Sequence, residues 1–233
     1  VQKLIEKTKT QLVQFWDTPS RCILAVAAEK IYKNHPYAKL ALGTHESLNK
    51  ITRDDCFDFY QKNISAFQAI FSIVGNLQKY DVEPLIEKKL GSWRSPSVAD
   101  LIYPAIDDVK PESFSIFKNR DQVVLAFAGI SVDRKHLDYD ALLVFDQLLT
   151  GGMSSRLFEL REQSGLFYTI GGSVVYGSAK QPGMIFIKTI VSKDRLDEAQ
   201  QAIAQCLNSA VDTISIDEFE QAKELVNECT MEL

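Results

Sequence analysis

The sequence lacks both a long hydrophobic run and an excess of basic residues. No stretch approaches the roughly 18–20 apolar residues that a membrane-spanning helix needs, and the apolar run at 22–28 is followed directly by charged residues. The formal net charge is −5 and the pI is about 5.3, whereas a nucleic-acid-binding surface needs clustered lysine and arginine. The sequence therefore predicts no membrane-spanning segment and no nucleic-acid partner.

Residues of the kinds that bind metals are few and scattered. The chain has four cysteines: Cys22, Cys56, Cys206 and Cys229. None belongs to a C-x-x-C motif, so we expect buried free thiols rather than a zinc finger or a redox pair. The chain has three histidines: His35, His45 and His136. None is followed by a second histidine four residues later, which is the spacing of a helical zinc site.

Helical patterns dominate the first part of the chain. Apolar spacing predicts helices over 1–16 and 20–33, and Thr52 with Asp55 three residues later predicts the start of a helix that ends near residue 62. A further helix is expected over 82–90, with Asp81 before it and Gly91 after it. The apolar run at 66–76 predicts a strand. The aromatic residues expected in the core of this region are Phe57, Phe59, Tyr60, Phe67 and Phe71.

The first residue already lies in a helical pattern, so we expect the chain to be part of a longer precursor. The spacing Glu6-x-x-Lys9 recurs as Glu220-x-x-Lys223, which suggests a duplicated unit. Between the two halves, residues 95–112 have scattered prolines and no clear period, and they are the predicted linker.

Strands and long helices follow one another after this linker. The expected strands cover 113–118, 122–130, 168–176 and 183–191. Helices are expected over 138–149 and over 195–211. A further helix is expected between them, directly after the segment TGGMSS that begins at Thr150. Ser215 with Glu218 three residues later has the spacing of a capping box for the last helix.

Three segments, in this order, resemble the insulinase-type metallopeptidases, a family that includes pitrilysin and mitochondrial processing peptidase. The first is HPYAKLALGTHESLNKIT, which begins at His35, and the second is FSIVGNLQKYDVEPLIEKKLGSW, which begins at Phe71. The third is LLTGGMSSRLFELREQSGLFY, which ends at Tyr168. Together the segments span nearly the whole chain, so the resemblance concerns the chain as a whole.

The resemblance implies an α+β fold with two similar units. Each unit has a mixed, mainly antiparallel sheet with helices packed on one side, and the units face each other across a peptide-holding chamber. Here the first unit (1–94) would lack its start and the second (113–233) its end, with 95–112 as the linker. Gly151 and Gly152 would let the chain turn sharply and would line the chamber.

The resemblance also implies a peptide-binding pair, Arg161 and Tyr168, which lie seven residues apart at a predicted helix end and strand start. A guanidinium and a phenol supply directed donors for a peptide carbonyl or a developing oxyanion. The alternative is that Arg161 pairs with a nearby acid and Tyr168 only packs. Arg156, earlier in the same segment, is interpreted as a structural arginine.

The sequence departs from an active member of this family at the metal site. Zinc in the family is bound through His-x-x-Glu-His, and no such string occurs here. The resemblance places Gln11 at the position of the family's glutamate ligand, and a neutral amide is a poor zinc ligand. Leu4 stands where active members also tend to carry an acid. We therefore expect no metal ligand and no catalytic residue in this chain, and zinc in a partner.

These observations favour a non-catalytic subunit that binds extended peptide for a zinc-bearing insulinase-like partner, as a heterodimer or alternatively a homodimer. Two other hypotheses stay open: a complete zinc metalloendopeptidase whose zinc motif lies upstream of residue 1, and a purely structural scaffold subunit. Family analogy favours the bacterial periplasm or envelope, with the mitochondrion as the alternative location.

Overall fold

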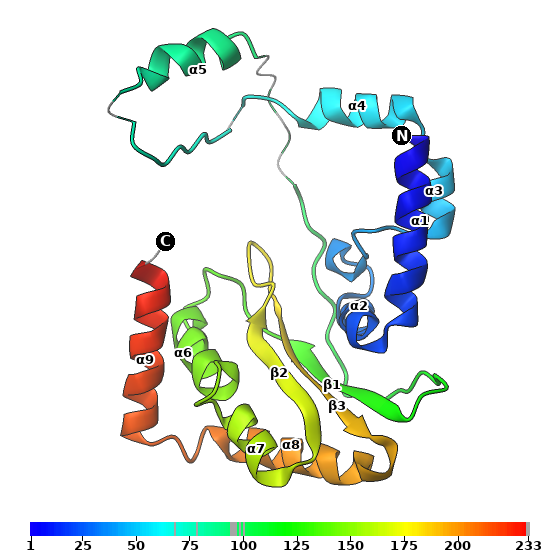
Figure 1. Cartoon of the computed structure of the whole chain (residues 1–233), viewed down its shortest axis with the longest axis vertical. Coiled ribbons are helices and arrows are strands. Elements are labelled where there is room, and N and C mark those ends of the chain that lie inside the picture. Colours follow the sequence, from blue (N-terminus) through cyan, green and yellow to red (C-terminus); the bar gives the residue numbers. More distant parts are fainter. Residues whose placement is uncertain (68, 78, 94–96, 98, 100, 232–233) are drawn as a thin grey trace. The chain divides into compact units, whose positions relative to one another are not determined.

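The three most strand-like segments of the second half pair into one antiparallel sheet (Figure 1). In this computed structural model, β1 is Gln122–Ile130, β2 is Phe167–Tyr176 and β3 is Met184–Ser192, with β3 in the centre of the order β1–β3–β2. All three are rich in β-branched and aromatic residues, which suit a pleated, half-buried surface. The strands predicted over 122–130, 168–176 and 183–191 are therefore confirmed.

The structure describes every residue except 68, 78, 94–96, 98, 100, 232 and 233. It divides into two units. Unit 1 comprises Val1–Leu12 and Ala41–Pro104, and unit 2 comprises Val13–Leu40 and Ala105–Leu233. The predicted linker at 95–112 and the predicted boundaries of two repeated units stay predictions, and residues 95, 96, 98 and 100 lie outside the described residues.

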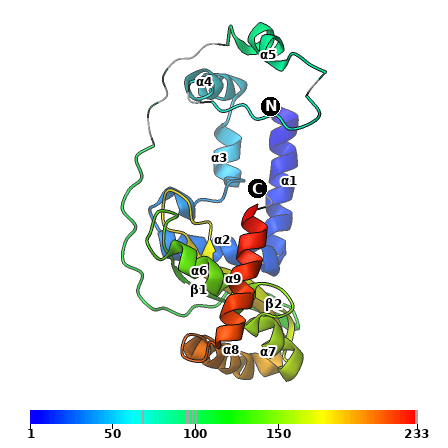
Figure 2. The same ribbon diagram turned by 90° about the vertical axis from the view of Figure 1, so that its left-hand side faces the viewer.

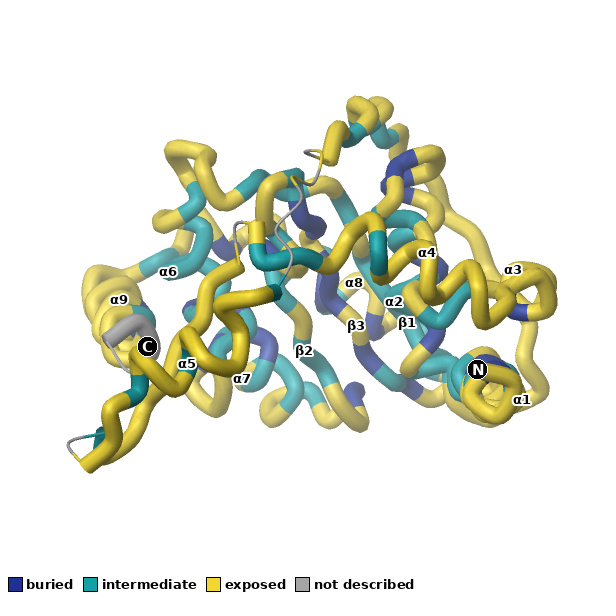
Figure 3. Tube along the Cα trace, turned by 90° about the horizontal axis from the view of Figure 1, so that it is seen from above, coloured by how far each residue is buried: buried dark blue, intermediate teal, exposed yellow. Residues whose placement is uncertain are grey.

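Alternation along β3 sends its side chains to two different layers of unit 2. One layer holds the helices α6 (Tyr139–Thr150), α7 (Arg156–Ser164) and α8 (Leu196–Ala210). Ile187 packs against α6 and α7, and Val191 packs against α8. On the other face, Met184 and Phe186 pack against the helix α2 (Pro19–Tyr32). Figure 3 shows the buried residues concentrated along the strands and the helices that cover them.

The remaining elements of unit 2 complete the helical layer. A short 3-10 helix, η2 (Lys193–Arg195), leads from β3 into α8, and η1 (Pro36–Ala38) follows α2. The last helix, α9 (Ile216–Met231), lies beside α6 (Figure 2). The capping box predicted for α9 is confirmed, because the Glu218 N–H donates to Ser215 Oγ and the Ser215 N–H donates to the Glu218 carboxylate.

Unit 1 is helical and mostly exposed. It contains most of α1 (Gln2–Asp17), together with α3 (His45–Lys50), α4 (Arg53–Asn63) and α5 (Val82–Leu90). The capping box of Thr52 and Asp55 is confirmed, whereas the Asp81 side chain makes no capping hydrogen bond. Gly91 follows α5 in a right-handed conformation rather than a left-handed one.

The aromatic side chains expected in the core of unit 1 are exposed, so that prediction is wrong. Phe59, for example, is 63% exposed, and Figure 3 shows α4 and α5 almost entirely in the exposed class. The physical reason is that no sheet of unit 1 lies among the described residues to cover these helices. The other exposed members of the set are Phe57, Tyr60, Phe67 and Phe71.

The strands predicted over 66–76 and 113–118 do not form among the described residues. A strand is stable only when a neighbouring strand satisfies its backbone groups, and neither segment has a ladder partner. In the first segment Ile70 is 94% exposed and Val74 is 95% exposed; residue 68 lies outside the described part. The second segment instead contacts helices: Lys30 of α2 lies over the Phe114 ring, and Lys118 donates to the Trp16 carbonyl.

The predicted α+β class with an antiparallel sheet and helical layers is confirmed. The helices α6–α8 cover one face of the sheet, and α2 covers part of the other, which the prediction of helices on a single side did not include. The duplication stays a prediction. No helix in the described ranges is both long enough and apolar enough to cross a membrane.

Candidate functional site

Arg161 and Tyr168 lie on either side of a sharp turn between α7 and β2. Arg161 is in the last turn of α7, and the helix ends at Gly165, whose φ of +58° is the left-handed conformation that glycine adopts without strain. The Gly165 N–H donates to the Arg161 carbonyl at 3.1 Å. Leu166 and Phe167 then enter the core, so the helix end and the strand start are both anchored.

The Arg161 guanidinium is held only weakly. Its Nη1 lies 3.2 Å from Oε1 of the adjacent, exposed Glu162, and its centre lies 5.6 Å from the centroid of the Phe158 ring. Neighbouring residues on a helix do not face each other, and exposed ion pairs contribute little to stability. Its Nε is buried and finds no hydrogen-bond partner in the described part of the chain. Arg161 therefore has donors that the fold does not use.

Tyr168 is the extra residue of a β-bulge. Phe167 pairs with Val191 and Thr169 pairs with Ile190, so the residue of β2 between them has no pairing partner on β3. A bulge redirects a side chain relative to the normal alternation of a strand. The Tyr168 side chain is 69% exposed. Its ring is therefore not packed into the core of unit 2.

Sequence reasoning missed Thr189, a buried threonine that bonds to the backbone beside this bulge. Its hydroxyl donates to the Thr169 carbonyl at 2.7 Å, and the residue is 1% exposed. The sequence feature that could have identified Thr189 is its place between Ile187 and Val191, on a face of β3 that is otherwise apolar. A buried hydroxyl needs a hydrogen-bond partner, so a threonine in such a row indicates a specific acceptor nearby.

Arg156 differs from Arg161 in how its donors are used. It donates from Nε and Nη2 to the two carboxylate oxygens of Glu218, each at 3.1 Å. Its remaining bonds go to the Ala210 carbonyl and to the hydroxyl and carbonyl of Thr213. The arginine thus joins α7 to the turn between α8 and α9, and its interpretation as structural is confirmed.

Gly151 and Gly152 form the turn between α6 and α7. A Cβ on Gly151 would collide with the side chain and carbonyl of Gln147, whose Nε2 donates to the Gly151 carbonyl at 2.9 Å. Gly152 has a φ of +89°, which favours glycine. The backbone here thus requires glycine at both positions. Whether the pair lines a peptide chamber stays a prediction.

The described residues do not supply a zinc-binding set. Among them, no three His, Cys, Asp or Glu side chains gather closely enough to hold a metal ion. Gln11, at the position of the family's glutamate ligand, is exposed on α1. His35 is buried, and its Nδ1 accepts a hydrogen bond from the Tyr37 N–H. The donor chemistry does not fit zinc, so we assign no metal-dependent step to this chain.

The described thiols differ in how far they are buried. Cys22 is buried, as expected, and Cys206 is only half-buried, whereas Cys56 is exposed on α4, so the prediction of a buried thiol is wrong there. The Cys229 side chain lies outside the described residues. Burial raises the pKa of the Cys206 thiol, and nearby Arg156 only partly opposes this shift. A raised pKa keeps the thiol protonated and weakly nucleophilic at neutral pH.

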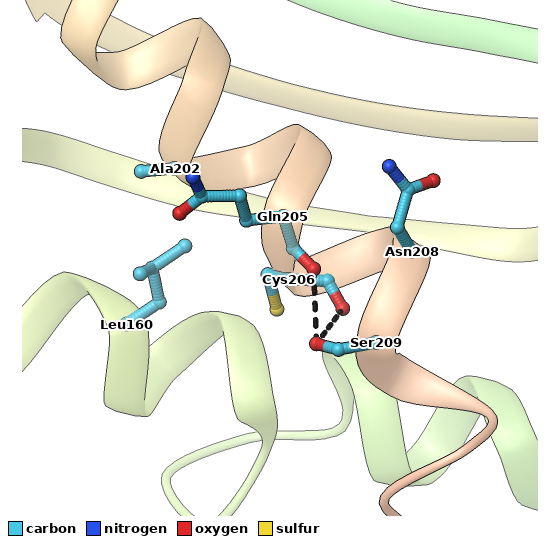
Figure 4. A pocket seen from close by; sticks show the side chains of 6 residues that line it. All are labelled: Leu160, Ala202, Gln205, Cys206, Asn208 and Ser209. Carbon is cyan, nitrogen blue, oxygen red and sulfur yellow. Dashed lines mark hydrogen bonds between the residues drawn. The ribbon is translucent and has the colours of Figure 1, made fainter.

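A shallow groove of about 560 Å³ lies between α7 and α8 (Figure 4). Its lining comprises Leu160, Ala202, Gln205, Cys206, Asn208 and Ser209. The Ser209 hydroxyl is occupied, since it donates to the Gln205 and Cys206 carbonyls of its own helix. Neither Arg161 nor Tyr168 contributes to this lining. The groove is therefore separate from the predicted peptide-binding pair.

Comparison with known proteins places the chain among peptidase-like proteins. A family model described as "Peptidase M16 inactive domain" matches residues 50–226. The chain is 26% identical over 218 residues to "Uncharacterized zinc protease YmxG" of Bacillus subtilis (strain 168), covering 92% of the chain and 52% of that protein. It is 27% identical over 177 residues to "Non-peptidase homolog YmxG" of Helicobacter pylori, covering 72% and 40%.

The fold has a close counterpart among solved structures. A crystal structure described as the peptidase M16 inactive domain from Pseudomonas fluorescens matches with a TM-score of 0.77 and 20% identity, covering 97% of this chain and 55% of that chain. The chain thus spans about half the length of the curated relatives it matches. The resemblance to the insulinase-type family is confirmed.

Proposed function

Because the chain belongs to the peptidase M16 inactive-domain family, we propose that it is a non-catalytic subunit that binds extended peptide through Arg161 and Tyr168. A zinc-bearing insulinase-like partner subunit would cleave the bound peptide. The observation that carries the proposal is the contrast between the two arginines of α7. Arg156 uses its donors within the fold, whereas the Arg161 side chain is 37% exposed and, among the described residues, makes an ion pair with Glu162 and a ring contact with Phe158.

The chemistry of the two side chains suits an extended peptide. Such a peptide presents backbone carbonyls that need donors, and its strand-like repeat is about 3.3 Å per residue. The guanidinium of Arg161 and the phenol of Tyr168 can each donate to such a carbonyl. Both stand on anchored elements, so less conformational entropy is lost on binding than for side chains on free loops.

Three further observations support a non-catalytic role. The chain has no His-x-x-Glu-His string, and one relative is itself named a non-peptidase homolog. The matching family model is described as an inactive domain. We also propose the heterodimer and the zinc-bearing partner, because the chain spans only part of the length of its relatives.

The proposal is tested on the native assembly, purified through a tag on the full-length protein. We expect Arg161→Ala and Tyr168→Phe each to lower the rate of cleavage of a fluorogenic peptide about tenfold, the equivalent of one lost directed interaction. Gel filtration should give unchanged assembly. Matched controls are Arg134→Ala, an exposed arginine whose Nε donates to the Tyr139 hydroxyl, and Tyr176→Phe, another exposed tyrosine of β2. Full cleavage by the doubly substituted protein would contradict peptide binding and favour the scaffold hypothesis.

A second candidate is a complete zinc metalloendopeptidase whose zinc motif precedes this chain. It is favoured by the relative named a zinc protease, of which the chain covers 52%. Elemental analysis of the full-length protein, purified without partners, distinguishes the two candidates. One tightly bound zinc per polypeptide would favour the complete protease, and its absence would favour the non-catalytic subunit.

A further inference from the structure

We propose that Thr189 is a positioning residue for Tyr168, and that its buried hydroxyl fixes the β-bulge from which the Tyr168 side chain projects. This inference deepens the proposed function and rests on it for its consequence in peptide binding. Its structural part, the control of Tyr168 orientation, can be measured without any peptide.

The register of the sheet places Tyr168 between two fixed residues. Phe167 is buried against Val191 and α8, so the strand is anchored immediately before the bulge. Immediately after it, Thr169 is held through its carbonyl by the Thr189 hydroxyl at 2.7 Å. The regular backbone ladder is disrupted at a bulge, so a side-chain donor there replaces part of the missing pairing. The orientation of Tyr168 therefore depends on both neighbours.

The choice of threonine at position 189 is hard to explain by packing alone. Its neighbours on the same face of β3, Ile187 and Val191, are apolar and buried. Valine has nearly the same volume as threonine and would fill the site without a polar group to satisfy. Because the hydroxyl has an acceptor at the bulge, the residue links the central strand to the backbone beside Tyr168.

The second bulge of β2 provides a matched control. β2 gains another extra residue between Ser173 and Tyr176, and there the Ser131 hydroxyl donates to the Val174 carbonyl at 2.6 Å. The bond is of the same kind, from a hydroxyl to a bulge carbonyl. It lies six residues further along the strand, or about 20 Å from Tyr168. Ser131→Ala should therefore remove an equivalent bond without affecting Tyr168.

The first measurement uses 3-fluorotyrosine placed at position 168 of the full-length protein. We expect the ¹⁹F resonance to move or broaden in Thr189→Val, to return to its original position in Thr189→Ser, and to stay unchanged in Ser131→Ala. Thr189→Cys has a weak thiol donor, so its resonance should lie between those of the unsubstituted protein and Thr189→Val. This variant replaces Thr189→Val in the comparison if the valine variant does not fold. An unchanged resonance in both the valine and cysteine variants would overturn the inference.

The second measurement follows binding of fluorescein-labelled β-casein, a polypeptide without a stable fold, by fluorescence polarisation. We expect Thr189→Val to weaken binding about fivefold, and to have no further effect once Tyr168 is replaced by alanine. Equal effects of Thr189→Val in both backgrounds would show a general structural role and overturn the inference. If the resonance shifts but Tyr168→Ala binds casein normally, the positioning stands and the proposed function fails.

Discussion

At the scale of single residues, the two arginines of α7 show how similar sequence signals lead to different roles. Both were visible in the same short segment. Only the long-range partners of Arg156 separate them, and these lie 54 to 62 residues away in the sequence. The positions of Arg161 and Tyr168 at a helix end and near a strand start followed from local spacing, because Ser-Gly-Leu is a strong helix stop. The bulge at Tyr168 could not be predicted, since it depends on the register with β3.

Glu218 makes the attachment of α9 sensitive to pH. Hydrogen bonds from the Ser215 N–H and hydroxyl, and then contact with Arg156, hold the pKa of this carboxyl below its ordinary value of 4.5. The folded protein therefore binds the proton less readily than the unfolded chain, and acid favours unfolding. The contribution is fully present above that ordinary value and is lost as the pH falls through the lower pKa of the folded state.

We accordingly expect Glu218→Gln to flatten the decline in the free energy of unfolding below about pH 4.5. Urea unfolding followed by circular dichroism at a series of pH values measures this slope. Glu220→Gln is the matched control, because its carboxylate lies on the same helix and contacts the exposed Lys223. A slope in Glu218→Gln equal to that of the unsubstituted protein would rule out the linkage.

At the scale of elements, Asp146 joins α6 to the second bulge of β2. Its carboxylate accepts hydrogen bonds from the Ser173 hydroxyl and the Val174 N–H, both at 2.8 Å, and from the Thr150 hydroxyl at 3.1 Å. Removing it leaves two donors, the Val174 N–H and the Ser173 hydroxyl, without these acceptors in a half-buried site. Such groups are costly to leave unpaired.

We expect Asp146→Ala to lower the free energy of unfolding by about 3 kcal/mol, measured by urea denaturation at neutral pH. Asp140→Ala, in the exposed first turn of the same helix, should change it by less than about 1 kcal/mol. Similar losses in the two variants would mean that the helix, and not its attachment to the bulge, is the sensitive feature.

Whether a helix or strand was predicted correctly depended on how far apart in the sequence its stabilising interactions lie. The capping boxes of Thr52 and Ser215 are complete within four residues of sequence, and both formed as predicted. The strands β1, β2 and β3 satisfy one another and also formed. The apolar runs at 66–76 and 113–118 have equally strand-like patterns, but a pattern cannot supply the neighbouring strand that a ladder needs. The apolar pattern therefore identified segments with β propensity, but it did not show which of them would pair into a sheet.

At the scale of the whole molecule, burial is distributed unevenly between the two units. Unit 2 holds all three of the clustered hydrophobic cores found among the described residues. Buried hydrophobic residues in the described part of unit 1 are limited to Ile5, Leu12 and Leu48. Since apolar burial is the main favourable term in folding, the two units should differ in local stability.

Hydrogen–deuterium exchange of the 233-residue chain, followed by mass spectrometry, measures that difference directly. We expect the amides of α4 and α5 to exchange at least about 100-fold faster than those of β3 and α8, after correction for the rates of the unfolded chain. Of these two helices of unit 1, α4 has a side-chain cap and α5 has none, and the apolar face of α4, including Phe57 and Phe59, is exposed and adds little to its stability. Caps alone contribute only about 1 kcal/mol each, too little to hold short helices closed. Equal protection in the two sets would instead mean that the aromatic face of α4 is covered in solution, either by a second copy or by another part of the chain.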